Sequence, residues 1–184
     1  MISNHDRSGW VGASDTAKVM GNWNTETFRA FWSEKLGYRV NNFRNTAMIA
    51  GTYYEHRILD AMRVKERDRQ IKKPELRLRV NLDGETKKKI VEVKTYGKDT
   101  FKVSAAYWQQ AQAEMFAAKK PLEIAAYRLL PEDYDNFYSP IDKDRLSVFP
   151  VEYDEAWVEE KYLPRLRILA DCLKHRRFPT MEEI

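Results

Sequence analysis

Two periodicities of apolar residues divide the chain into helical and extended segments. In TETFRAFWSEKLG, from Thr25 to Gly37, apolar positions recur at three- and four-residue spacing, which predicts a helix closed by the glycine. Those positions are Phe28, Phe31, Trp32 and Leu36. In ELRLRVNLD the spacing falls to two, which predicts a strand with Arg77, Arg79, Asn81 and Asp83 on its polar face. The apolar face of that strand is formed by Leu76, Leu78, Val80 and Leu82.

The same patterns place the other elements. Helices are predicted from a Ser14 or Asp15 cap to Met20, from about Thr46 to Arg67, over 105–120 after a Ser104 cap, and over 154–178, where Pro164 should kink or split the helix. The buried side of the helix from Thr46 is expected to carry Ile49, Tyr53, Ile58, Leu59 and Met62. Asp83 and Gly84 are expected to start a turn that leads into a second strand over 87–95. Further strands are predicted at 122–130 and, with a weaker pattern, at 147–153.

This order of elements predicts an α/β fold in which helices flank a mixed central sheet. The chain has no internal repeat, no low-complexity tract and no Gly/Ser linker, so residues 1–184 are expected to form one domain that ends in the helix at 154–178. A chain of 184 residues can bury about 70% of the surface that its unfolded form exposes. The fold therefore needs no disulfide or structural metal.

Composition excludes several classes of protein. Cys172 is the only cysteine, so a single chain cannot form a disulfide framework, a Cys-rich zinc site or a four-cysteine iron–sulfur cluster. No 18 apolar residues run together, and MISNHDRSGW lacks the apolar core of a signal peptide. We therefore expect a cytoplasmic protein without membrane association.

The charge is modest in sum but uneven along the chain. The net charge is +4, from 32 basic and 28 acidic residues. Eight Lys or Arg stand against three acids in residues 63–79, and six stand against Asp171 alone in residues 161–177. Such patches attract the phosphates of nucleic acid, but they are equally typical of a solvated helix face.

The predicted hairpin carries candidate chemistry in Asp83, Glu92 and Lys94. Strand geometry puts Glu92 and Lys94 side by side, and antiparallel pairing brings Asp83 close to them. Two converging carboxylates favour a hard cation such as Mg²⁺, and a neighbouring lysine can orient or deprotonate the attacking water in phosphodiester hydrolysis. Surface hairpins also carry alternating Glu and Lys as solvated pairs. In a chain that is 33% charged, the pattern alone leaves both interpretations open.

Four short sequence motifs, in this order along the chain, favour the catalytic interpretation of the hairpin over the solvated one. These are RSGWVGASD from Arg7, MIAGTYYE from Met48, NLDG to VEVK from Asn81 to Lys94, and AYWQQAQ from Ala106. Together they resemble the phage lambda exonuclease family, also called the YqaJ-type viral recombinase nucleases, of the PD-(D/E)XK superfamily. The resemblance covers residues 7–150 and implies a restriction-endonuclease-like core.

The resemblance also implies roles for individual residues. Asp83 and Glu92 correspond to the metal-binding acids, with the backbone carbonyl of Val93 as a further ligand, and Lys94 to the residue that activates or positions the water. Glu55 corresponds to the helical acid that completes or supports the metal site, directly, through a water molecule or as a ligand of a second metal. Gln110 corresponds to the active-site glutamine. Arg7 and Ser14 correspond to the pair that holds the terminal 5′-phosphate, a role that suits a guanidinium and a hydroxyl at a helix N-terminus.

The implied activity is a Mg²⁺-dependent 5′-to-3′ exonuclease that acts on double-stranded DNA ends and leaves 3′ single-stranded tails for recombination. Mn²⁺ is expected to substitute for Mg²⁺. The implied partners are a single-strand annealing protein and two further copies of the chain in a ring-shaped homotrimer, and the implied source is a phage or prophage in a bacterial host. Two alternatives stay open: a restriction- or repair-type endonuclease of the same superfamily, and a DNA-binding module without catalysis.

Several other residues receive more ordinary interpretations. Tyr107 is a candidate for DNA contact, although at least one of Tyr107 and Trp108 is expected in the core. Lys87, in the KKK of the turn, is a second candidate, with a solvated turn favoured for the three lysines. Gln112 is expected to satisfy a backbone group, Cys172 to be a small buried residue, and the histidines to be structural or on the surface. The histidines are His5, His56 and His175.

Overall fold

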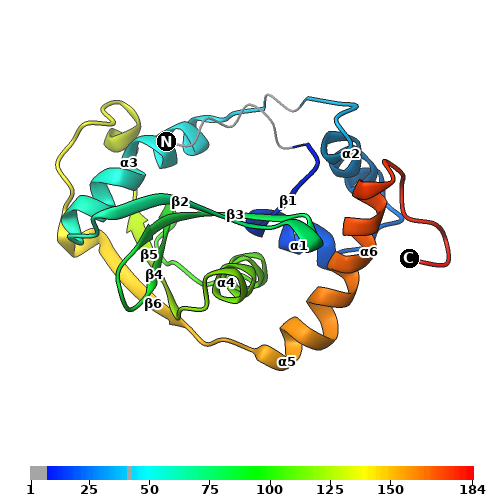
Figure 1. Cartoon of the computed structure of the whole chain (residues 1–184). Helices are drawn as coiled ribbons and strands as arrows, with labels where there is room; N and C mark the ends of the chain where they lie inside the picture. Colours follow the sequence, from blue (N-terminus) through cyan, green and yellow to red (C-terminus); the bar gives the residue numbers. More distant parts are fainter. Residues whose placement is uncertain (1–7, 41–42) are drawn as a thin grey trace.

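A mixed sheet forms the centre of the computed structural model, which describes residues 8–40 and 43–184 (Figure 1). The strands of this part of the chain are β1 (Val11–Gly12), β2 (Glu66–Lys73), β3 (Leu78–Glu85), β4 (Ile90–Tyr96), β5 (Leu122–Arg128) and β6 (Leu146–Val151). They are arranged in the order β1-β3-β4-β5-β6, and β2 pairs with β3. The β1–β3 and β4–β5 pairs are parallel and the other pairs are antiparallel. The predicted mixed α/β fold is confirmed.

Helices cover both faces of the sheet. The helices are α1 (Thr16–Met20), α2 (Glu26–Lys35), α3 (Thr46–Ala61), α4 (Ala105–Ala118), α5 (Glu155–Trp157) and α6 (Leu163–Lys174). In Figure 1, α3 lies above the sheet and α4 below it, while α2 and α6 close one end. Val91 and Val93 of β4 pack in the core under α3, whereas Ile90 packs in the core that contains α4. Because strand side chains alternate, Glu92 also points towards α4.

Several predicted helix boundaries are confirmed by side-chain caps. Thr25 accepts a hydrogen bond from the Phe28 amide at 3.1 Å, Ser104 from the Tyr107 amide at 3.2 Å and Asp154 from the Trp157 amide at 2.8 Å. Ser14 is not such a cap, because it lies inside a 3₁₀ turn (Ala13–Asp15) that precedes α1. The helix after Asp154 is split as predicted, and a π-helical turn (Val158–Tyr162) joins α5 to α6 just before Pro164.

The helix predicted from Thr46 to Arg67 is wrong at its C-terminal end. The helix ends at Ala61, and strand β2 begins at Glu66. The predicted buried positions were also partly wrong: Ile49 and Tyr53 are exposed, while Ala50 and Tyr54 are buried beside Ile58 and Leu59. Apolar residues occur on both sides of this helix, so periodicity alone did not identify the side that faces the sheet.

The predicted hairpin is correct in its strands and wrong in its turn. Leu76, Leu78, Val80 and Leu82 are all buried. Asp83 and Gly84 lie inside β3, and the chain turns at 86–89, where the Thr86 amide donates to the Lys89 carbonyl at 2.8 Å. Gly84 is needed for close packing: a Cβ there would lie 2.7 Å from Leu59 Cδ2 and 2.9 Å from Val64 Cγ1. Within residues 8–40 and 43–184, no helix has the length and apolar character required to cross a bilayer.

Candidate active site

The site lies where β3 and β4 separate. These strands pair at Gly84↔Val91 and Glu85↔Ile90, and the next positions in that register, Asp83 and Glu92, mark the start of the fork. Beyond this point the Val93 amide donates to Asp83 Oδ2 at 2.8 Å. A side-chain carboxylate thus takes the place of the backbone acceptor in the next hydrogen bond between the strands. The fork brings the two predicted metal-binding acids to one point.

A hydrogen-bond network joins Glu92 to α4. Lys94 Nζ lies 2.6 Å from Glu92 Oε1 and 3.2 Å from Gln110 Oε1. The Gln110 amide nitrogen donates to Glu92 Oε1 at 2.6 Å and to Glu114 Oε1 at 2.8 Å. Gln110 thus holds both the acid and the lysine in place, and the structure brings Asp83, Glu92, Lys94 and Gln110 together as predicted.

Two carboxylate oxygens in this network have no hydrogen-bond partner among the described residues. They are Glu92 Oε2 and Glu114 Oε2, and both are buried. A buried acceptor without a partner is costly, so each of these atoms is a position for a proton, a water molecule or a cation. The donor set of Asp83, Glu92 and the Val93 carbonyl consists of oxygen atoms, which suits Mg²⁺.

The pKa shifts of the acids around the fork show that their negative charges repel one another. Burial raises the pKa of Asp83 well above its ordinary value, and the charges of Glu92 and Glu55 raise it further. Burial and the charge of Glu92 likewise raise the pKa of Glu55, which α3 carries towards the site. The three carboxylates therefore oppose one another's ionisation, and a cation bound among them would relieve that repulsion.

The same carboxylates favour the charged form of Lys94, whereas they disfavour the charged forms of Asp83 and Glu55. Burial lowers its pKa, but the neighbouring Glu92 and Asp83 carboxylates raise it more, and the net pKa lies above the ordinary value. Its ammonium group also lies 5.0 Å from the Tyr107 ring centroid. Lys94 is therefore a charged hydrogen-bond donor beside the Glu92 carboxylate.

Glu114 was missed by the sequence interpretation. It is fully buried, and burial together with the charge of Glu92 raises its pKa well above the ordinary value. It lies four residues after Gln110 on α4, and residues at that spacing share a helix face. That spacing was a usable signal, because it places a second acid beside Gln110.

Replacing Glu114 with Gln should change how stability depends on pH. Since the pKa of Glu114 is higher in the folded than in the unfolded protein, its favourable contribution is complete below the unfolded value and is lost as the pH rises through the folded value. We expect Glu114→Gln to gain stability relative to the parent protein between pH 5 and 8, with a slope of at most about 1.4 kcal/mol per pH unit. Urea denaturation at several pH values measures this. A difference that does not grow with pH would show that Glu114 is already ionised in the fold.

A cavity of about 200 Å³ connects the fork with the N-terminal segment. Its wall includes Asp83, Gln110 and Glu114 of the fork and α4, together with Ser14 and Arg79. Lys35 and Asp15 also line it and form a buried ion pair of 2.5 Å. Ser14 is exposed and opens onto this cavity, as a phosphate-binding residue would need to; Arg7 lies outside the described residues.

The other candidate residues separate into core and surface. Trp108 packs edge-on against Trp157 at 4.9 Å, and Tyr107 stacks on Phe101 at 5.9 Å, so both have intramolecular partners. Gln112 has the expected backbone role: it donates to the Glu152 carbonyl and accepts from the Asp154 amide, each at 2.8 Å. Cys172 is buried as predicted, and Lys87 is exposed in the turn at 86–89. DNA contact by Tyr107 and Lys87 stays a prediction.

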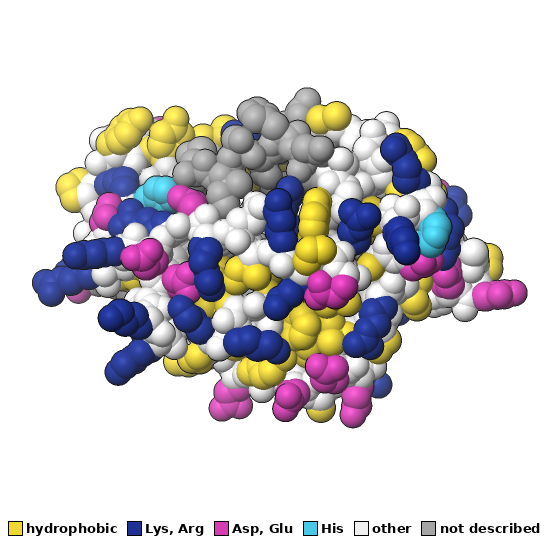
Figure 2. Space-filling model, viewed as in Figure 1, with side chains coloured by type: hydrophobic (Ala, Val, Ile, Leu, Met, Phe, Trp, Pro, Cys, Tyr) yellow, Lys and Arg dark blue, Asp and Glu magenta, His cyan; other side chains and the backbone are white. Residues whose placement is uncertain are grey.

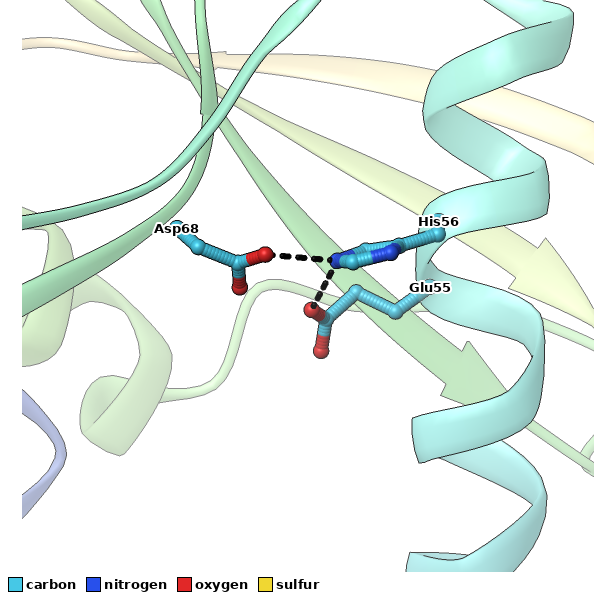
Figure 3. A group of neighbouring side chains, drawn as sticks. All are labelled: Glu55, His56 and Asp68. Atoms are coloured by element: carbon cyan, nitrogen blue, oxygen red, sulfur yellow. Dashed lines mark ion pairs between the residues drawn. The ribbon is translucent and has the colours of Figure 1, made fainter. Parts of the chain in front are cut away.

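His56 is less isolated than expected. Adjacent helical residues diverge, yet the long side chain of Glu55 bends towards the imidazole, and Glu55 Oε1 lies 3.8 Å from His56 Nε2 (Figure 3). Asp68 of β2 approaches from the other side, with Oδ2 at 3.0 Å from the same nitrogen. These contacts agree with a structural or surface role for His56, and they also gather three potential ligand atoms.

Comparison with known proteins gives a match in structure alone. No family model and no curated protein sequence matches the chain. The crystal structure of an alkaline exonuclease from Laribacter hongkongensis superposes with a TM-score of 0.62 and 22% identity, over 92% of this chain and 94% of that one. That of a phage-related exonuclease from Haemophilus somnus 129PT gives 0.61 and 12%, over 90% and 95%. The fold is thus shared with these exonucleases over nearly the full length, and the fold expected from the resemblance is confirmed.

Proposed function

We propose that the protein is a Mg²⁺-dependent nuclease that degrades duplex DNA from its 5′ ends. The observation that carries this proposal is the fork of β3 and β4, where Asp83, Glu92, Lys94 and Gln110 meet within a fold shared with two exonucleases. Asp83, Glu92 and the Val93 carbonyl would hold Mg²⁺, with Glu55 as a further ligand. When bound, the ion would make a water nucleophilic and offset the charge that develops on the phosphate.

The chain's own groups supply positioning and charge. Glu92 is held by Lys94 and Gln110, so its second oxygen is fixed in direction before any ligand arrives. The Lys94 ammonium has hydrogens to donate to the attacking water or to a phosphate oxygen. Such groups act through preorganisation, because their orientation does not change during the reaction.

The proposed direction of degradation rests on the cavity beside the fork. A terminal phosphate bound there by Ser14, with Arg7 from the preceding segment, would lie next to the cleavage site. The basic groups for the rest of the duplex are available on the surface. Figure 2 shows Lys and Arg side chains spread over the visible face, and strand β2 exposes Lys72.

Three substrates test this proposal. With Mg²⁺, we expect rapid loss of linear duplex with 5′-phosphates, at least tenfold slower loss of the same duplex with 5′-hydroxyls, and no cleavage of a covalently closed circle. Gel analysis with a label on one strand identifies the strand that is lost. Cleavage of the circle would instead indicate an endonuclease of the same superfamily. DNA binding without cleavage in Mg²⁺ or Mn²⁺ would indicate a non-catalytic DNA-binding module.

The proposal extends to assembly. A ring-shaped homotrimer would keep the enzyme on its DNA, and a single-strand annealing protein would coat the 3′ tail for recombination. Light scattering of the purified chain distinguishes a trimer from a monomer.

A further inference from the structure

We propose that Glu55, His56 and Asp68 form a second cation site, which prefers a transition-metal dication of the Zn²⁺ type over Mg²⁺. Among the described residues, this is the group of His, Cys, Asp or Glu side chains that brings three ligand atoms within 4.8 Å of one another. Figure 3 shows the carboxylates of Glu55, from the same helix, and of Asp68, from strand β2, reaching the same ring nitrogen of His56.

The distances suit a bound ion. Two ligand atoms about 2.1 Å from one ion lie about 3.0 Å apart at a right angle and about 3.4 Å apart at a tetrahedral angle. The His56–Asp68 separation is 3.0 Å, and the His56–Glu55 separation of 3.8 Å needs only a small side-chain rotation. All three side chains are partly exposed, between 28% and 39%, so an ion and its remaining water ligands can reach them.

The donor types determine the preference. Imidazole nitrogen is a good ligand for Zn²⁺, Ni²⁺ and Co²⁺, whereas Mg²⁺ is held mainly by oxygen atoms and water. A neutral imidazole with two carboxylates carries a charge of −2, which a divalent ion neutralises. The oxygen ligands at the fork and the mixed ligands here therefore select different ions.

Strand β2 places Asp68 for this contact. Arg67 pairs with Gly84 and Arg69 with Leu82, so Asp68 stands opposite Asp83, where the regular pairing is interrupted. Asp68 has a φ of +54°, in the left-handed region that non-glycine residues seldom adopt. The cluster is therefore adjacent to the fork, and it shares Glu55 with the proposed catalytic centre.

Binding to the metal-free full-length protein, without an affinity tag, tests the site directly. We expect Co²⁺ to give a visible absorption band typical of nitrogen ligation, and Zn²⁺ to displace it with one ion per chain. His56→Gln should weaken Zn²⁺ binding, measured by calorimetry, by at least about 100-fold, since loss of even a supporting residue costs about 10- to 100-fold. Asp68→Asn should weaken it as well.

The chain offers a matched control in His175. Its Nδ1 atom lies 3.1 Å from an Asp171 carboxylate, so among residues 8–40 and 43–184 it forms a similar pair without a third ligand, and His175→Gln should leave Zn²⁺ binding unchanged. Asp83→Asn should also retain the Co²⁺ band, although it should abolish the proposed nuclease activity. The two proposals can thus fail separately.

Two results would overturn the proposal. One is a Co²⁺ spectrum without nitrogen ligation, or one that His56→Gln leaves intact, which would reduce the cluster to an ion pair. The other is loss of the band in Asp83→Asn to the same extent as in His56→Gln, which would place the ion at the fork. If His56→Gln does not fold, ¹⁵N spectra of labelled histidine in the parent protein decide, because Zn²⁺ must shift the His56 ring signals and leave those of His175 in place.

Discussion

Glu92→Gln should reduce the rate at which the protein degrades linear duplex DNA in Mg²⁺ by about 10³-fold or more. Glu92 is the meeting point of the network: one oxygen is held by Lys94 and Gln110, and the other is buried and directed by them. The amide keeps the shape of the side chain but removes the negative charge that a cation requires. Loss of one preorganised electrostatic group typically costs about 10²- to 10³-fold, and loss of a metal ligand costs at least as much.

The measurement should separate chemistry from folding and DNA binding. Single-turnover cleavage gives the rate, thermal unfolding reports the fold, and binding of duplex DNA in Ca²⁺ reports affinity. Glu160→Gln is a matched control, because Glu160 is exposed on the turn between α5 and α6, and it should cleave at the parental rate. Glu92→Gln that cleaves within threefold of the parent protein would show that the fork is not the active site.

Lys94→Met should reduce the rate of duplex DNA cleavage by a similar factor, for a different physical reason. The substitution removes the ammonium group that donates to Glu92 and lies near Gln110, while methionine retains part of the stem. If Lys94 positions the water, activity should not return when the pH is raised, whereas a general base replaced by solvent hydroxide would show partial recovery. The raised pKa of Lys94 favours the first outcome.

The residues of the fork were accessible from sequence because strands have a strict period of two. Alternation in residues 75–83 and 90–94 was enough to put Glu92 and Lys94 on one face, and the structure agrees. Glu55 and Gln110 could not be found in that way, since each comes from a helix distant in sequence. Their selection depended on the family resemblance, and the structure brings Gln110 into direct contact with Glu92 and Lys94.

Strand β2 could not be predicted from hydrophobic pattern. Its sequence, ERDRQIKK, contains one apolar residue, Ile71, so it has no alternation to read. The strand forms because β3 supplies hydrogen-bond partners on both sides of Asp68, which is a tertiary effect. Asp68 could not be recognised from the sequence for the same reason. Its proximity to His56 depends on the pairing of β2 with β3, and the sequence of β2 has the polar pattern of a solvated segment.

Asp133→Ala should be the most destabilising of the single substitutions considered, at about 3–5 kcal/mol. Asp133 is 2% exposed, although PEDYD reads as a solvent-exposed turn. Its carboxylate forms an ion pair of 2.5 Å with Arg145, accepts from the Leu130 amide at 2.7 Å and accepts from the Tyr54 hydroxyl at 3.2 Å. Alanine would remove the carboxylate and leave the largely buried guanidinium of Arg145 with weaker partners. Removing one member of a buried ion pair destabilises a protein more than replacing both members with apolar residues.

The pH dependence of this effect has a definite sign. Burial raises the pKa of Asp133, but the hydrogen bonds from Arg145 and Leu130 lower it more, so the net pKa is below the ordinary value. Its stabilisation is therefore complete above the unfolded value, about 3.9, and is lost as the pH falls through the folded value. The difference between the parent protein and Asp133→Ala in urea denaturation should be large at pH 7 and should shrink below pH 4.

Two further variants identify the cause. Asp135→Ala, at an exposed position two residues later, should stay within about 0.5 kcal/mol of the parent protein, and Tyr54→Phe should cost about 1 kcal/mol. Because Tyr54 precedes Glu55 on α3, Asp133 also fixes the helix that carries the site's third acid. If Asp133→Ala and Asp135→Ala were equally stable, the contacts of Asp133 would be energetically neutral. The position of Glu55 would then depend on the apolar packing of α3 against β4 and β5.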